Sequence, residues 1–252
     1  MKNLTISTAE PFFLPGGKTG CVMVHGFTGA PKEMRLMGNY LNGHGITVIG
    51  IRLPGHATQM SDMVRTRWRD WLASVEDGIN LLSDFCDDIF VAGLSMGGIL
   101  ALMAASRYAI DGAIAMSAPY TISNDWRVKL AKQISLFMPY VKKEQSDTLD
   151  QKTSKDHVDY HAYPTRSIAE LNELVDTLHN YLDQIRIPVL LINSKNDKTV
   201  PPSHAENYRH EIPSNHFELV TLENSGHVIT EDIEREIVFT TALTFIRKYS
   251  KQ

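Results

Sequence analysis

Short apolar runs recur along this chain, and segments with helical periodicity separate them. The runs do not alternate apolar and polar residues, so they predict strands that are buried on both faces. Strands are expected at Gly20 to His25, Ile46 to Gly50, Asp88 to Ala92, Gly112 to Met116, Pro188 to Asn193 and Phe217 to Thr221. Alternating strands and helices favour an α/β fold with a mostly parallel central sheet flanked by helices.

Two of the intervening helices have clear sequence signals. One carries its apolar side chains on a single face, formed by Trp68, Trp71, Leu72, Val75, Ile79 and Leu82. We interpret its two tryptophans as core or rim residues rather than substrate contacts. The last helix is expected to begin with Thr230 as its cap and to continue through Ile233, Ile237 and Val238.

One segment, from Thr121 to about Tyr163, interrupts the alternation of strands and helices. Within it, Pro139 ends an expected helix over Trp126 to Met138, and the stretch from Lys142 to Asp159 is charged and polar. The alternation resumes at a helix that we expect to be capped near Ser167, with Glu170 three residues on.

Long insertions in compact domains tend to be lids or binding loops. We therefore expect a single domain over residues 1–252 with a small inserted cap at about 121–163. An ordinary surface helix with a long loop is the alternative. If the segment is a cap, its apolar helical face would contact substrate through Trp126, Leu130, Ile134 and Phe137.

A Gly-x-Ser-x-Gly pattern centred on Ser95 follows the strand at Asp88 to Ala92 and precedes a run compatible with a helix. A nucleophile elbow needs this order of strand, strained turn and helix, because the serine oxygen must project from the sheet edge. Gly93 and Gly97 leave room for the crowded turn. The alternative is a Gly/Ser loop that only joins a strand to a helix.

A serine hydroxyl becomes a strong nucleophile only when a base accepts its proton and a carboxylate orients that base. On this kind of sheet, the partners follow the serine in the order Asp or Glu, then His. Asp197 and His227 each lie in a loop after a predicted strand. Catalytic groups of open α/β sheets gather at such strand ends, so Ser95, Asp197 and His227 are the candidate catalytic residues.

Acyl transfer also needs hydrogen-bond donors for the oxyanion, and these are usually backbone amides. In this architecture one donor is the amide after the nucleophile, which is that of Met96. The second comes from the loop after an early strand, where we select Phe27. We interpret the neighbouring His25 as a buried residue that holds this loop by hydrogen bonds.

Together these residues resemble the α/β-hydrolase family, and within it the bacterial carboxylesterases and monoacylglycerol lipases. By that resemblance Ser95, Asp197 and His227 form the triad, while the Phe27 and Met96 amides bind the oxyanion. The resemblance covers nearly the whole chain and rests on residues 25–29, Gly55-His56, Asp70-Trp71, residues 93–98, Asp197 before Val200-Pro201-Pro202, and residues 225–230.

The chain departs from the family pattern at two positions. Ala57 stands where many relatives have a second glycine after the Gly-His pair. His161 stands in the cap where some monoacylglycerol lipases carry a carboxylate that could meet a glycerol headgroup. The second departure argues against a strictly glyceride-specific activity.

Composition narrows the class of protein further. The chain has 252 residues, of which 43% are hydrophobic, and a net charge of −4, so nothing indicates a nucleic-acid partner. The first residues lack a signal-peptide pattern, and no apolar stretch is long enough to span a bilayer. We interpret Cys21 and Cys86 as reduced thiols. We therefore expect a cytoplasmic protein without stable membrane insertion, and its oligomeric state is left open.

Other motifs are weaker. Gly17-Lys18-Thr19 resembles the end of a phosphate-binding loop, but Phe12 occupies the required glycine position and the motif precedes its strand. His157 and His161 have the spacing of metal ligands, yet their polar surroundings favour a solvated pair. We interpret His56 as a structural hydrogen-bonding residue.

The sequence thus predicts a serine carboxylester hydrolase that acts on short- to medium-chain acyl esters, with monoacylglycerols among the candidates. Its partner is a small-molecule ester, and the chemistry needs no metal or organic cofactor. One alternative is a hydrolase that keeps the triad but cleaves a thioester or a carbon–carbon bond, because fold and triad alone do not separate these. Another is a ligand-binding member of the fold that has lost catalysis.

Overall fold

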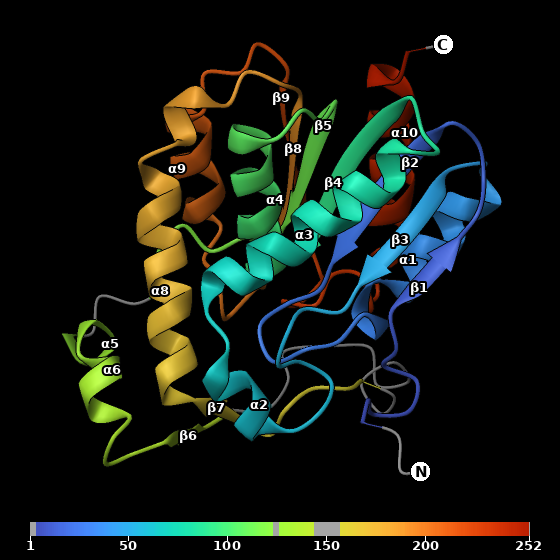
Figure 1. Cartoon of the computed structure of the whole chain (residues 1–252). Coiled ribbons are helices and arrows are strands. Elements are labelled where there is room, and N and C mark those ends of the chain that lie inside the picture. Colours follow the sequence, from blue (N-terminus) through green and yellow to red (C-terminus); the bar gives the residue numbers. More distant parts are fainter. Residues whose placement is uncertain (1–3, 123–125, 144–156, 252) are drawn as a thin grey trace.

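The computed structural model describes residues 4–122, 126–143 and 157–251. Its central strands are β1 (Phe12–Leu14), β2 (Thr19–Val24), β3 (Thr47–Ile51), β4 (Asp88–Leu94), β5 (Gly112–Met116), β8 (Val189–Ser194) and β9 (Phe217–Leu222). They form one sheet in the order β1-β3-β2-β4-β5-β8-β9 (Figure 1). All of these strands run parallel except β1, which pairs antiparallel with β3 at one edge.

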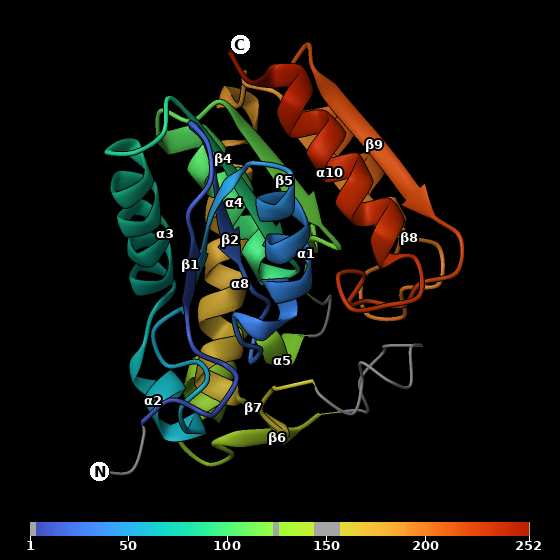
Figure 2. The same cartoon turned by 90° about the vertical axis from the view of Figure 1, so that its right-hand side faces the viewer.

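Helices cover both faces of the sheet (Figure 2). One face carries α1 (Lys32–Gly43) and α10 (Arg235–Tyr249), and the other carries α3 (Trp68–Ser83), α4 (Met96–Arg107), α8 (Thr165–His179) and α9 (Ser203–Glu211). Shorter elements are α2 (Met60–Arg65) and a 3₁₀ helix at Leu182–Gln184. Within the described ranges, no helix combines the length and the apolar character needed to cross a bilayer.

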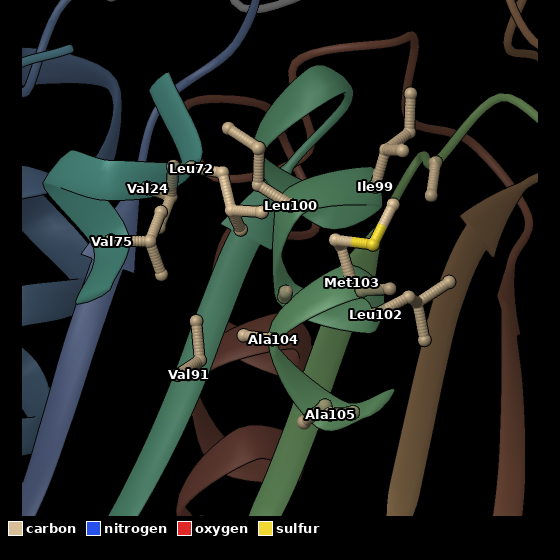
Figure 3. Close-up of a cluster of buried hydrophobic side chains, with 14 of the residues drawn as sticks. Val24, Leu72, Val75, Val91, Ile99, Leu100, Leu102, Met103, Ala104 and Ala105 are labelled. Carbon is tan, nitrogen blue, oxygen red and sulfur yellow. The ribbon is translucent and has the colours of Figure 1, made fainter. Parts of the chain in front are cut away.

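Each face of the sheet has its own core, because successive side chains of a strand point to opposite faces. In β4, Val91 packs into the cluster that contains Val75 of α3 and Leu100 of α4 (Figure 3). Phe90 and Ala92 belong to the cluster under α1 and α10. Burial on both faces explains why these strands are continuous apolar runs in the sequence.

The strand order reverses between β2 and β4. These strands are neighbours, but from β2 the chain first goes outward to β3 and then returns to β4 on the other side. Open α/β sheets bind their ligands outside the carboxyl ends of the strands at such a switch point. Phe27 lies in the loop after β2, and Ser95 directly follows β4.

All the strands predicted from the apolar runs are present, with small shifts of their ends. The strand β1 was not predicted; it is three residues long and lies between Pro11 and Pro15. A strand this short shows no recognisable periodicity. It forms because β3 offers it an edge, where Phe13 pairs with Ile49.

The single helix predicted over Trp126 to Met138 is wrong. The structure has two four-residue helices instead, α5 (Trp126–Lys129) and α6 (Ala131–Ile134), and Leu130 between them has a non-helical ψ of 11°. Both helices contact α8, and β6 (Tyr140–Lys142) then pairs antiparallel with β7 (Ala162–Pro164). Figure 1 shows these four elements near the beginning of α8.

The capping interaction predicted near Ser167 is also wrong. The helix α8 begins at Thr165, directly after Pro164. The Ser167 hydroxyl donates a hydrogen bond to the Met63 carbonyl at 3.2 Å, so it joins α8 to α2. Glu170 forms an ion pair with Arg67 instead of closing a capping box, because tertiary partners are available to both side chains.

Candidate active site

Ser95 is the single residue between β4 and α4, and its backbone has φ 55° and ψ −116°. Residues other than glycine rarely adopt such a positive φ, and this strain is typical of functional turns. The close approach of the flanking backbones requires glycine. A Cβ at Gly93 would lie 1.9 Å from the Gly97 carbonyl oxygen, and one at Gly97 would lie 2.2 Å from that of Val24.

The structure brings Ser95, His227 and Asp197 together from three different loops. Ser95 Oγ lies 3.0 Å from His227 Nε2, and His227 Nδ1 lies 2.8 Å from Asp197 Oδ2. The His227 side chain is 14% exposed, whereas that of Asp197 is 1% exposed. A buried carboxylate therefore fixes an imidazole that both touches the serine and can be reached from solvent.

Asp197 is held by backbone donors of its own loop. Its Oδ1 accepts the amides of Thr199 at 2.8 Å and Val200 at 2.7 Å. Its Oδ2 is left to accept the Nδ1 proton of His227, which leaves Nε2 unprotonated and able to accept the Ser95 proton. The arrangement is that of a serine activated by an oriented base.

Two carboxylates shape the loop that carries His227. Glu234 accepts the amide and hydroxyl of Ser225, each at 2.8 Å, and Asp232 accepts the Gly226 amide at 2.7 Å. These contacts correct the predicted start of the last helix. Thr230 is not its cap, because Asp232 and Glu234 turn back to the loop and α10 begins only at Arg235.

Both candidate oxyanion donors belong to segments that meet at the serine, since a Cβ at Gly26 would lie 3.6 Å from Ser95 Cβ. Met96 is the first residue of α4, where amides have no partner within the helix. Phe27 lies in the loop after β2, the strand that pairs with β4. Its preceding residue, Gly26, donates its amide to Glu33 Oε2 at 2.8 Å, so the direction of this loop is fixed from α1.

His25 and His56 stabilise this loop without touching the serine. The Leu53 amide donates to His25 Nε2 at 3.1 Å, and His25 Nδ1 contacts the Gly26 carbonyl at 2.9 Å. The two imidazole rings meet edge to face, with centroids 5.0 Å apart. Burial lowers the pKa of His25 to about 4 and that of His56 well below its ordinary value, so both are structural neutral residues, as predicted.

The three described residues of the four predicted to contact substrate from the cap differ widely in exposure. Leu130 is 42% exposed and Phe137 is 91% exposed, while Ile134 is half-buried. The backbone of Trp126 lies in α5, and its side chain is outside the described residues. Since the predicted continuous helix is absent, the continuous apolar face that it would carry is absent too.

A buried charged cluster beside the site was not predicted from the sequence. His157, predicted to be solvated, has a side chain only 6% exposed and contacts Glu231 and Glu33. Its partner in the predicted pair, His161, is exposed. No sequence signal separates them, because a charged segment looks solvated until the tertiary contacts are known. In the part of the chain that the structure describes, no group of three or more His, Cys, Asp or Glu residues could hold a metal ion.

An elbow serine, a histidine and a carboxylate on the carboxyl ends of a mostly parallel sheet define an α/β-hydrolase. Comparison with known families agrees. The chain belongs to the family described as serine aminopeptidase, S33, whose model matches residues 17–234.

The chain is also similar to individual proteins. The chain is 36% identical to a thermostable monoacylglycerol lipase of Bacillus sp., over 97% of both chains. It is 28% identical to a carboxylesterase of Bacillus subtilis, over 97% of this chain and 99% of the other. A solved structure described under the metagenome-derived lipolytic enzymes LipS and LipT superposes with a TM-score of 0.91 at 30% identity, over 97% of this chain and 99% of that chain.

Proposed function

We propose that this protein is a serine carboxylester hydrolase that acts on short- to medium-chain acyl esters, monoacylglycerols among them, through an acyl-enzyme on Ser95. The observation that carries the proposal is the continuous hydrogen-bonded path from Asp197 through His227 to Ser95. The relatives named as a monoacylglycerol lipase and a carboxylesterase support ester cleavage as its reaction.

In the first half of the reaction, Ser95 Oγ attacks the ester carbonyl carbon while His227 Nε2 takes its proton. The negative charge on the carbonyl oxygen is stabilised by the amides of Phe27 and Met96. When the tetrahedral intermediate collapses, the bond to the alkoxy oxygen breaks and His227 returns the proton to the leaving alcohol. Asp197 keeps the imidazole oriented and stabilises its cation throughout.

In the second half, water replaces the alcohol. His227 removes a proton from the water as its oxygen attacks the acyl carbon, and the same two amides bind the oxyanion. Collapse releases the carboxylic acid, and the proton from His227 restores the Ser95 hydroxyl. None of these steps calls for a metal or an organic cofactor.

The remaining expectations accompany this proposal. The chain is one hydrolase domain with a cap at about 121–163, and the pairing of β6, near the middle of that segment, with β7 at its end supports the cap. Its natural partner is a small-molecule ester, with no nucleic acid involved. A cytoplasmic location stays a prediction.

The proposal is tested with Ser95→Ala, with Ser61→Ala on the surface of α2 as the matched control. Turnover of p-nitrophenyl butyrate should fall on the order of 10⁶-fold in Ser95→Ala, the loss expected when a serine protease loses its nucleophile. The control should keep wild-type activity. Substantial ester hydrolysis by folded Ser95→Ala would refute the mechanism.

A substrate panel separates the rival functions. It should contain esters of increasing acyl length, a monoacylglycerol, an acyl thioester and alanine p-nitroanilide, the last because of the family's name. The proposal expects the ester series to give the highest kcat/KM. Preference for the thioester or the anilide would reassign the reaction, and failure of wild-type Ser95 to react with a fluorophosphonate would favour a non-catalytic binding protein.

A further inference from the structure

A cluster of buried charged side chains joins the cap to α1 and to the loop that carries His227. His157 Nδ1 lies 2.8 Å from Glu231 Oε2, and its Nε2 lies 3.7 Å from Glu33 Oε1 and 3.6 Å from Asp159 Oδ2. The side chains of Glu33 and Glu231 are as buried as that of His157. Carboxylates lie at both ring nitrogens, and the imidazole can donate a proton towards each of them only as the doubly protonated cation.

The surrounding charges favour that cation. Burial by itself lowers the pKa of His157, but the hydrogen bonds to Asp159 and Glu231 and the charges of Glu33 and Glu231 outweigh it and raise the pKa. Burial raises the pKa of Glu33, and the His157 charge opposes this effect. Lys143 is a second cation near the cluster, and it pairs with Asp159. The positive charge of His157 thus favours the ionised form of Glu33.

Glu33 connects the cluster to the loop that carries Phe27. Its Oε2 accepts the Gly26 amide at 2.8 Å, and the next peptide along the chain is that of Phe27. The loop wraps so closely around this carboxylate that a Cβ at Gly29 would lie 2.0 Å from Glu33 Oε1. The position of Glu33 therefore determines the position of the Phe27 amide.

The cap also holds the residue after Phe27. Thr28 has a φ of 65°, which is unfavourable for a β-branched side chain and persists only where its surroundings hold it. Lys143 Nζ donates to Thr28 Oγ1 at 3.2 Å, and the Tyr160 amide donates to the Thr28 carbonyl at 3.1 Å. Residues on both sides of Phe27 are thus held by contacts that lead to the cap.

Glu231 connects the same cluster to the loop that carries His227. It lies four residues after His227, and its amide donates to the Val228 carbonyl at 3.0 Å within the same turn. The next residue, Asp232, holds the Gly226 amide. One imidazole therefore bridges a residue that directs the Phe27 loop and a residue that belongs to the His227 loop.

We propose that His157 is a positioning residue, whose imidazolium holds Glu33 and Glu231 together and thereby aligns the Phe27 amide with Ser95 and His227. This inference rests on the proposed function, because it needs ester hydrolysis with the Phe27 amide as an oxyanion donor. It gives the cap a role in the chemical step that is separate from any contact with substrate.

The test compares His157→Gln, Glu231→Gln and the double variant in hydrolysis of p-nitrophenyl butyrate. Loss of an oxyanion donor costs about 10²–10³-fold in kcat, so its misplacement should lower kcat by roughly tenfold or more. KM should change little, because the role proposed for His157 is to position an oxyanion donor and not to bind the acyl or alcohol group of the substrate. The double variant should be no slower than His157→Gln, because the two single substitutions break the same contact between His157 and Glu231.

The matched control is His210→Gln, at an exposed position on α9, and it should behave as the wild type. An unchanged kcat in folded His157→Gln, a rise in KM alone, or additive losses in the double variant would overturn the proposal. If His157→Gln does not fold, nitrogen-15 NMR of the wild type decides, because His157 should show two protonated ring nitrogens at pH 8. A neutral His157 ring would overturn the proposal as well.

The Ser95→Ala variant distinguishes a failure of the positioning role from a failure of the proposed function. If Ser95→Ala is inactive and His157→Gln is fully active, only the positioning role fails. If Ser95→Ala remains active, the proposed function fails and the kinetic comparison no longer reports on an oxyanion donor. The NMR measurement on the wild type then still tests whether His157 is the bridging cation.

Discussion

Replacing Asp197 with asparagine should nearly abolish activity although it changes the shape of the site very little. The amides of Thr199 and Val200 point at Oδ1, so the asparagine must place its carbonyl oxygen there. Its amino group then occupies the Oδ2 position, 2.8 Å from His227 Nδ1. Because an amino group only donates, Nδ1 must become the acceptor and the ring proton moves to Nε2.

With a proton on Nε2, His227 can no longer accept the proton of Ser95 Oγ, which lies 3.0 Å away. We expect kcat to fall by about 10⁴-fold, the loss that this substitution causes in a serine protease through the wrong tautomer. That factor corresponds to about 5.5 kcal/mol of transition-state free energy. Stability should change little, because Asp197 keeps its two backbone hydrogen bonds as asparagine.

The assay is steady-state hydrolysis of p-nitrophenyl butyrate by Asp197→Asn, with thermal unfolding as the check on folding. Asp77→Asn, at an exposed position on α3, is the control for a lost negative charge. A folded Asp197→Asn variant within tenfold of the wild type would refute the reasoning. It would mean that the tautomer of His227 does not depend on this carboxylate.

Two further predictions concern pH and the cap. Since burial lowers the pKa of His25 to about 4, below its ordinary value of 6.5, His25 contributes stability that is complete above pH 6.5 and is lost as the pH falls towards 4. This contribution amounts to about 3 kcal/mol. In urea unfolding, His25→Gln should therefore lose less stability between pH 7 and pH 4 than the wild type does. Equal losses in the two proteins would contradict this prediction. Phe137→Ala should leave the dependence of kcat/KM on acyl length unchanged, because the Phe137 side chain is 91% exposed. A shift in the preferred acyl length would instead show that the cap closes over substrate.

The amino-acid sequence was sufficient for the parts of the molecule that depend on local pattern. Strands buried on both faces must be apolar throughout, so β2, β4 and β8 were recognisable from their runs alone. The turn at Ser95 was recognisable because two backbones approach too closely for any residue but glycine at Gly93 and Gly97. The order of Ser95, Asp197 and His227 along the chain follows from the order of the strands that carry them.

Local pattern was misleading where tertiary partners outweigh propensity. Helical spacing from Trp126 to Met138 predicted one helix, but contacts with α8 leave two short ones and an exposed Phe137. Thr230 looked like a helix cap, yet the carboxylates of Asp232 and Glu234 bind amides of the His227 loop and delay the helix to Arg235.

The burial of His157 could only come from the tertiary structure. In the sequence, His157 lies in a charged segment for which the pattern predicts exposure to solvent. It is far from Glu33 and Glu231 along the chain. The fold brings the three side chains together from the cap, α1 and the His227 loop. An ion-pair cluster between distant segments has no periodicity and no fixed spacing in the sequence. The fold of the chain decides which charges come into contact, and the sequence around each residue does not.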